Sequence, residues 1–127
     1  MIKSIVFRHG LCLCLTLTWL AACSQPADAR LHLESLRSAQ ILLQQPDLTV
    51  VDVRTQEEWE EGHLPNATWV PPREWATIAS RVPADKPLLL VCRSGGRAQK
   101  VAQTLIEQGH PEVHVLVDAG VPELLKL

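Results

Sequence analysis

The segment from Leu88 to Ala102 constrains the fold more than any other part of the chain. Four apolar residues, 88–91, follow the helix-breaking Pro87 and predict a short buried strand. Cys92 comes next, then a tight loop with two glycines and two arginines, then a stretch with the apolar spacing of a helix. A cysteine between a strand and a helix N-terminus faces unpaired backbone N–H groups and the positive end of the helix dipole. Such surroundings stabilise a thiolate, which is the nucleophilic form of cysteine.

Cys92 therefore has two interpretations. It is either a reactive nucleophile or an inert cysteine buried at the end of a strand, which is common for a free cysteine. The loop favours the nucleophile, because its glycines and the positive charges of Arg93 and Arg97 would have no purpose around an inert thiol.

The rest of the chain alternates short apolar stretches with helical patterns. Further strands are predicted at 49–53, 68–70 and 113–117, and helices at 31–45, 73–81 and 98–108. Ser35 is a candidate cap of the first helix, and Thr55 with Glu58 fits the capping box of another short helix. This alternation predicts an α/β domain with a parallel sheet. Ligands of such sheets bind at the carboxyl ends of the strands, where Cys92 falls.

The N-terminal residues have the pattern of an export signal. Lys3 and Arg8 form a basic start, residues 11–19 are mostly apolar, and Leu20-Ala-Ala-Cys23 ends the stretch. This order resembles the signal of bacterial lipoproteins, in which cleavage precedes a cysteine that is then acylated. The apolar run is too short to span a bilayer comfortably. An ordinary secretory signal cleaved nearby and an uncleaved anchor are the alternatives.

The lipoprotein signal pattern and the remaining chain together predict three segments. They are a signal peptide at 1–22, a lipidated N-terminus and tether at 23–30, and one domain at 31–127. Cys23 would carry the lipid, and several acyl chains are enough for stable anchoring to a membrane. We therefore expect a lipoprotein of the bacterial cell envelope that faces the periplasm. Ser24, after the cysteine, slightly favours the outer membrane over the inner one.

Cysteine count and charge narrow the chemistry further. Cys12 and Cys14 leave with the predicted signal and Cys23 is acylated, so Cys92 is the remaining thiol. Loss of the signal also leaves 10 of the 12 basic residues against 14 acidic ones, a net charge near −4. With no basic stripe outside the Cys92 loop, nucleic acid is not expected as a partner. No cofactor is expected, and no metal site either, because the histidines show no ligand spacing: His32, His110 and His114.

Three motifs, taken in order, resemble a single-domain rhodanese, a family of sulfurtransferases. They are Asp52-Val53-Arg54, then Glu58 followed by Gly62-His63-Leu64-Pro65-Asn66-Ala67, and then Cys92-Arg93-Ser94-Gly95-Gly96-Arg97. The resemblance extends from about Leu31 to Gly120 and is closest to the small periplasmic thiosulfate sulfurtransferases. It implies a rhodanese-like α/β fold with about five mainly parallel strands flanked by helices, and a cysteine loop that cradles an anion.

The resemblance also implies a reaction. The Cys92 thiolate would attack the outer sulfur of a small anionic donor such as thiosulfate, release sulfite and keep a persulfide, which a thiol or cyanide acceptor then takes. Substrate-binding roles fall on the loop residues Arg93, Ser94, Gly95, Gly96 and Arg97, although one arginine could instead pair with a local carboxylate. Structural roles near the site fall on Asp52, Arg54 and His63.

Three other functions are compatible with parts of this pattern. Phosphatases and arsenate reductases of this fold place five residues between cysteine and arginine, whereas four separate Cys92 from Arg97, and this narrower cradle suits a single sulfur better than a phosphoryl group. A thiol oxidoreductase would need a second cysteine to resolve a mixed disulfide. A non-catalytic rhodanese module or persulfide carrier, which binds a protein partner at the envelope, is the remaining alternative.

The C-terminal end departs from the family pattern. Many relatives have two glycines after the last strand and then a helix that carries a tryptophan. Here residues 118–122 replace that pattern and only residues 123–127 follow, so the closing helix can form barely one turn. We expect this difference to affect the last wall of the pocket, and turnover more than fold.

Overall fold

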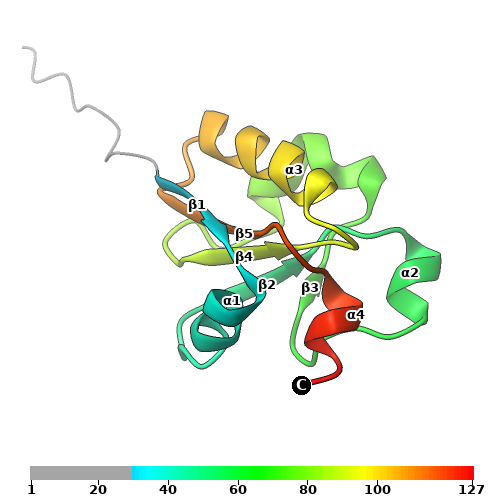
Figure 1. Cartoon of the computed structure of the whole chain (residues 1–127). Helices are drawn as coiled ribbons and strands as arrows, with labels where there is room; N and C mark the ends of the chain where they lie inside the picture. The colour runs from blue at the N-terminus through cyan, green and yellow to red at the C-terminus, as the bar shows by residue number, and fades with distance from the viewer. Residues whose placement is uncertain (1–29) are drawn as a thin grey trace, which may run out of the picture.

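The computed structural model describes residues 30–127 (Figure 1). The predicted signal, Cys23 and the tether up to residue 29 lie outside the described residues. Within residues 30–127, no helix combines the length and the apolar character needed to cross a membrane. The elements in chain order are β1 (Arg30–Glu34), α1 (Leu36–Leu42), β2 (Thr49–Asp52), α2 (Gln56–Glu60), β3 (Thr68–Trp69), the 3₁₀ helix η1 (Pro72–Ser80), β4 (Leu88–Val91), α3 (Gly96–Glu107), β5 (Glu112–Leu116) and α4 (Val121–Leu124).

The five strands form one parallel sheet in the order β1-β5-β4-β2-β3. Successive side chains of β4 alternate between two cores, because side chains of a strand point to opposite faces. Leu88 and Leu90 pack with α3 and η1, whereas Leu89 and Val91 pack with α1 and α4. Helices therefore cover both faces of the sheet (Figure 1). The predicted α/β fold with a five-stranded parallel sheet is confirmed.

The predicted helix at 31–45 is wrong in its first part. Ser35 does cap a helix, accepting a hydrogen bond from the backbone N–H of Ser38, but that helix starts at Leu36 and residues 30–34 form β1 instead. In this strand Leu31 and Leu33 alternate with His32 and Glu34, in register with β5. The strand prevails over the helical spacing because pairing with β5 satisfies the backbone groups of these residues. Leu31 and Leu33 stay exposed on this edge strand, so their burial is not what decides between the two structures.

The other expected elements lie close to their predicted positions. Thr55 and Glu58 form the predicted capping box of α2, with both reciprocal hydrogen bonds present. The helix predicted at 73–81 is the 3₁₀ helix η1, whose path is broken at Thr77 (φ −117°, ψ 20°) and whose Ile78 is fully buried. The closing helix α4 has four residues and so forms barely one turn, as expected.

Candidate functional site around Cys92

Cys92 directly follows β4 and begins the loop that leads into α3. Its side chain is almost fully buried, and its Sγ accepts a hydrogen bond from the backbone N–H of Gly95 at 3.0 Å. Gly95 needs to be glycine for two reasons. Its φ is +88°, and a Cβ there would lie 2.7 Å from the Cα of Val117. The loop therefore holds a backbone N–H on the sulfur at the N-terminus of a twelve-residue helix.

The short C-terminal segment contacts the backbone of this loop. The N–H of Val121 donates a hydrogen bond to the carbonyl of Cys92 at 3.0 Å. A Cβ on Gly120 would lie 2.0 Å from the carbonyl oxygen of Arg93, so no side chain fits there. Sequence reasoning missed this role of Gly120, for which the only signal was a glycine just before a short terminal helix. The start of the short helix α4 thus contacts the first two residues of the loop.

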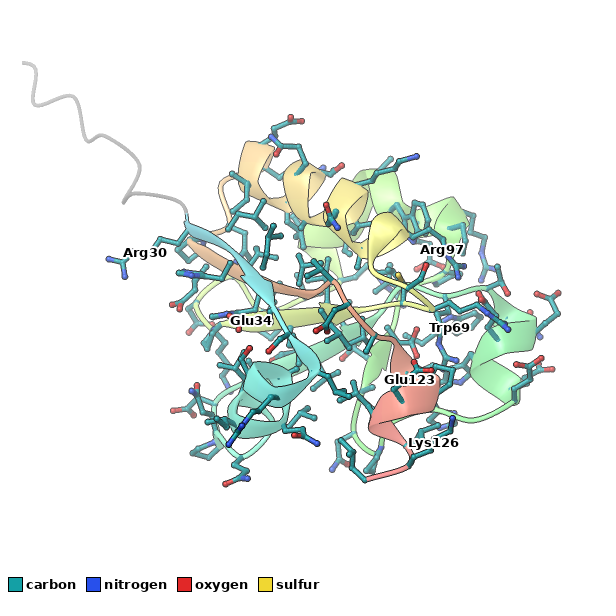
Figure 2. All side chains as sticks on the ribbon, viewed as in Figure 1. Arg30, Glu34, Trp69, Arg97, Glu123 and Lys126 are labelled. Atoms are coloured by element: carbon teal, nitrogen blue, oxygen red, sulfur yellow. The ribbon has the colours of Figure 1, made fainter. Side chains whose placement is uncertain are left out.

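Arg97 forms a double ion pair with Glu58 of α2. Its two terminal nitrogens lie 2.6 and 2.7 Å from the two carboxylate oxygens, an arrangement that fixes both position and orientation. Figure 2 shows Arg97 at the N-terminal end of α3. These hydrogen bonds lower the pKa of Glu58 from 4.5 to about 2, and they raise the pKa of Arg97 above its ordinary value. Of the two arginines, Arg97 is therefore the one held closely by a local carboxylate.

Glu58 has two roles, and the sequence alone revealed only one of them. Its Oε2 also accepts a hydrogen bond from the backbone N–H of Thr55 at 3.0 Å, which is the capping contact that the sequence predicted. The capping pattern explains Glu58 locally, so nothing in the sequence pointed to a partner 39 residues away. The same carboxylate joins the start of α2 to the start of α3.

Replacing Glu58 with glutamine should lower stability in a pH-dependent way. Glutamine keeps the capping hydrogen bond but removes the charge opposite Arg97. Because the pKa of Glu58 is about 2 in the folded protein and 4.5 in an unfolded chain, the carboxylate contributes stability above pH 4.5 and loses it as the pH falls toward 2. We expect Glu58→Gln to cost about 2 kcal/mol at neutral pH and progressively less between pH 5 and pH 2. Urea unfolding at several pH values measures this difference.

The control for this experiment is Glu61→Gln, which changes an exposed carboxylate just after the same helix. Its effect should stay within about 0.5 kcal/mol at every pH. A cost for Glu58→Gln that is equally large at pH 2 and pH 7 would contradict the ion-pair explanation.

The remaining loop residues lie toward solvent. Ser94 and Gly96 are exposed, and a Cβ at Gly96 would meet no atom within 4 Å. The side chain of Arg93 is 64% exposed and approaches Glu58 only at 3.9 Å. Arg93 is therefore the more exposed of the two loop arginines.

Asp52 and Arg54 form a buried ion pair at the end of β2. Arg54 donates to both carboxylate oxygens of Asp52, and its Nη2 also donates to the carbonyl of Gly62 at 2.7 Å. Asp52 lies opposite Val91 in the register of β2 and β4, one residue before Cys92. The pair joins the end of β2 to the turn after α2.

His63 lies in that turn and is exposed. Its ring stacks on Trp59, with ring centroids 3.8 Å apart and planes 6° apart, and its Nδ1 lies 3.1 Å from the carbonyl of Trp59. Trp59 in turn stacks on Trp69, whose indole N–H donates to the carbonyl of Arg54. The structural role of His63 stays a prediction, and these contacts are the ones that such a role would use.

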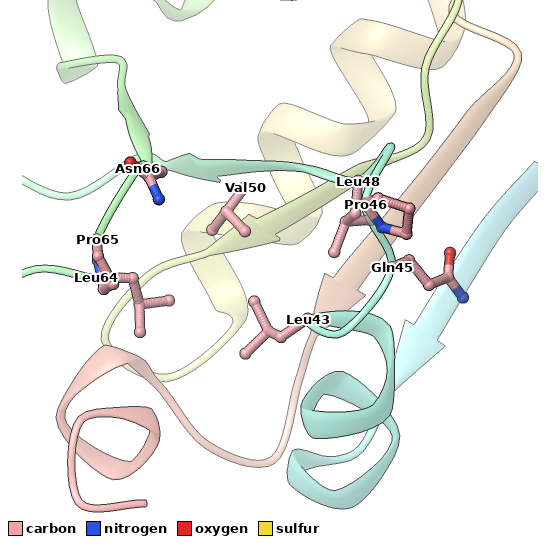
Figure 3. A pocket seen from close by; sticks show the side chains of 8 residues that line it. All are labelled: Leu43, Gln45, Pro46, Leu48, Val50, Leu64, Pro65 and Asn66. Atoms are coloured by element: carbon pink, nitrogen blue, oxygen red, sulfur yellow. The ribbon is translucent and has the colours of Figure 1, made fainter.

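A cavity of about 420 Å³ lies between the end of α1, β2 and the turn after α2 (Figure 3). Its walls are mainly apolar and carry no charged residue: Leu43, Gln45, Pro46, Leu48, Val50, Leu64, Pro65 and Asn66. None of these residues belongs to the Cys92 loop. The cavity therefore does not supply the anion cradle expected at the cysteine.

Comparison with protein families matches residues 35–124 to the rhodanese-like domain. The chain belongs to the rhodanese-like family. Thiosulfate sulfurtransferase GlpE of Coxiella burnetii is 35% identical over 86 residues, which cover 68% of this chain and 77% of that relative. Thiosulfate sulfurtransferase GlpE of Vibrio cholerae is 30% identical over 93 residues, covering 73% and 86%.

Solved structures agree with this rhodanese-like assignment. The crystal structure of a rhodanese-like domain protein from Staphylococcus aureus matches with a TM-score of 0.61 and 27% identity, covering 70% of this chain and 86% of that one. The family resemblance and the rhodanese fold that the sequence predicted are confirmed.

Proposed function

We propose that this rhodanese-like protein is a sulfurtransferase that moves sulfane sulfur from a small anionic donor such as thiosulfate to a thiol or cyanide acceptor. The observation that carries the proposal is the contact between the Cys92 sulfur and the Gly95 N–H, in a loop between β4 and the N-terminus of α3. A backbone donor on the sulfur and the positive end of a helix dipole both favour an anionic sulfur. Relatives named as thiosulfate sulfurtransferases support the same chemistry.

The proposed reaction has two steps. The Cys92 thiolate attacks the outer sulfur of thiosulfate, the bond between the two donor sulfurs breaks, and its electron pair leaves with sulfite. A persulfide anion remains on Cys92. The acceptor thiolate or cyanide then attacks the outer sulfur of this persulfide, and the electron pair of the breaking S–S bond restores the Cys92 thiolate.

The loop supports both steps by electrostatics. The N–H of Gly95 and the N-terminus of α3 stabilise negative charge on the thiolate and then on the persulfide. Arg93, with its exposed guanidinium, is the residue we assign to attract the anionic donor and to accompany the departing sulfite. Arg97 is assigned mainly a positioning role, since its charge is paired with Glu58 and it holds the start of α3.

The test is the intact mass of residues 24–127 before and after incubation with thiosulfate, with excess donor removed. We expect a gain of about 32 Da, one sulfur atom, on the protein, and its loss on addition of cyanide. A mass gain that cyanide removes, without steady-state turnover, would favour the persulfide carrier instead. No gain with thiosulfate or with other sulfane donors would reject the persulfide mechanism.

We also propose that the protein is anchored in the bacterial envelope through an acylated Cys23. The support is the order of the basic start, the apolar stretch and Leu20-Ala-Ala-Cys23. Cys23→Ala should move the protein from the membrane fraction to the soluble fraction of a bacterial host and should stop incorporation of labelled palmitate. Labelled palmitate that still enters the variant would show that the acylation site is elsewhere.

A further inference from the structure

Two histidines and a glutamate come together at the edge of the sheet, although they are far apart in the sequence. His32 and Glu34 belong to β1, and His114 belongs to β5, where the parallel register places it opposite His32. One ligand atom from each of the three side chains lies within 4.8 Å of the other two. The sequence predicted no metal site here, because spacing along the chain cannot show which residues two paired strands bring together.

His32 presents a ring nitrogen that has no partner. Its Nε2 is buried and makes no hydrogen bond within residues 30–127, which is unusual because a buried polar atom without a partner costs stability. The ring stacks on that of His114, with centroids 4.7 Å apart and planes 18° apart. An imidazole held rigidly with an unused nitrogen is available to a ligand.

His114 has a carboxylate at each of its two ring nitrogens. Its Nδ1 lies 2.7 Å from Glu34, and its Nε2 lies 3.1 Å from Glu112. Metal-bound histidines usually donate their second ring N–H to a carboxylate or carbonyl, which fixes the ring orientation. If Nδ1 of His114 bound a metal ion beside Glu34, Nε2 would keep Glu112 as such a partner.

Glu34 is suited to be the anionic ligand. Its side chain is 16% exposed, and Figure 2 shows it at the end of β1. Its Oε1 lies 2.7 Å from Nδ1 of His114, so the carboxyl group already lies beside the histidines of the cluster.

We propose that His32, Glu34 and His114 bind a divalent transition-metal ion such as Zn²⁺, with Glu112 as the outer carboxylate that orients His114. Two imidazoles and a carboxylate are an N/O donor set that zinc takes, with a fourth position left for water. Tetrahedral donors at about 2.1 Å from zinc lie about 3.4 Å apart. Because an imidazole binds a metal in its ring plane, the stacked rings of His32 and His114 would have to turn out of their present parallel arrangement to bind one ion.

The bound ion would join the edge strand β1 to its neighbour β5. Its ligands belong to neither the Cys92 loop nor the residues that contact that loop, so the site is independent of sulfur transfer. An edge strand has only one hydrogen-bonded neighbour, so a cross-strand metal bridge adds to its attachment. The expected consequence is a more stable domain rather than a new catalytic centre.

The test is Zn²⁺ binding by the full chain in detergent, measured by competition with a chromophoric chelator and by the thermal midpoint. We expect one equivalent to bind and the midpoint to rise with Zn²⁺ concentration. His32→Gln is the sharpest variant, since the Nε2 that it removes makes no hydrogen bond in the described chain. Its affinity should fall at least about tenfold, because even outer partners of metal ligands contribute 10- to 100-fold. Glu34→Gln should weaken binding in the same way.

Two controls separate this site from other zinc ligands of the chain. His63→Gln removes an exposed histidine elsewhere, and Cys92→Ser removes the buried thiol; both should bind Zn²⁺ as the unmodified chain does. The Co²⁺ form should lack a thiolate charge-transfer band. The proposal is overturned if the chain binds no Zn²⁺, if His32→Gln binds as tightly as the unmodified chain, or if binding is lost in Cys92→Ser.

Discussion

Cys92→Ser is expected to lower sulfur transfer from thiosulfate by at least about 1000-fold, because a serine hydroxyl cannot form a persulfide. The fold should remain, since serine is close in size and its oxygen can also accept the hydrogen bond from Gly95. The free energy of unfolding should change by no more than about 1 kcal/mol. Steady-state transfer to cyanide and urea unfolding of the same preparation give the two measurements.

Ser94→Ala is the matched control for this variant, because it removes an exposed hydroxyl from the same loop. It should retain transfer to within about tenfold, as expected for a side chain that forms no covalent intermediate. Transfer that persists in Cys92→Ser would reject Cys92 as the nucleophile. An equal loss in both variants would mean that the loop backbone, rather than the sulfur atom, had been disturbed.

The second large effect is expected for Asp52→Asn. Asp52 is fully buried, and its carboxylate is the partner of Arg54, whose side chain is only 3% exposed. Asparagine leaves a buried guanidinium without a counter-charge, and breaking a buried pair in this way costs about 3–5 kcal/mol. Small domains are stable by only about 5–15 kcal/mol, so the variant should be close to unfolding at 37 °C. The measurement is the free energy of unfolding in urea.

Two further variants test the cause of this loss. Adding Arg54→Met to Asp52→Asn removes the unpaired charge, so the double variant should be more stable than Asp52→Asn alone. Asp47→Asn, at an exposed position before β2, should change stability by less than about 0.5 kcal/mol. A loss below about 1 kcal/mol for Asp52→Asn would show that Arg54 finds another partner.

The sequence by itself determined those features that depend on neighbouring residues. Apolar runs such as Leu88–Val91, the breaker Pro87 and the cap of Thr55 with Glu58 act over a few residues, so they predict strands, helix starts and their order correctly. The same local patterns predict that Cys92 lies between a strand and a helix, and the structure has it between β4 and α3. Local patterns also gave a wrong prediction for residues 31–34. The leucines of residues 31–36 fit a helix as well as a strand, and only pairing with β5 decides for the strand.

Only the tertiary structure decided which distant side chains meet. Arg97 pairs with Glu58, and Gly120 lies against the carbonyl of Arg93, because packing of α2 and α4 brings these segments to the loop. His32 faces His114 because two strands 82 residues apart pair in one register. No periodicity carries such information, since register and packing are set by the sheet and both of its cores together. For this reason the place of Cys92 between a strand and a helix could be predicted from the sequence, whereas the partners that hold its loop, and the histidine pair at the sheet edge, could not.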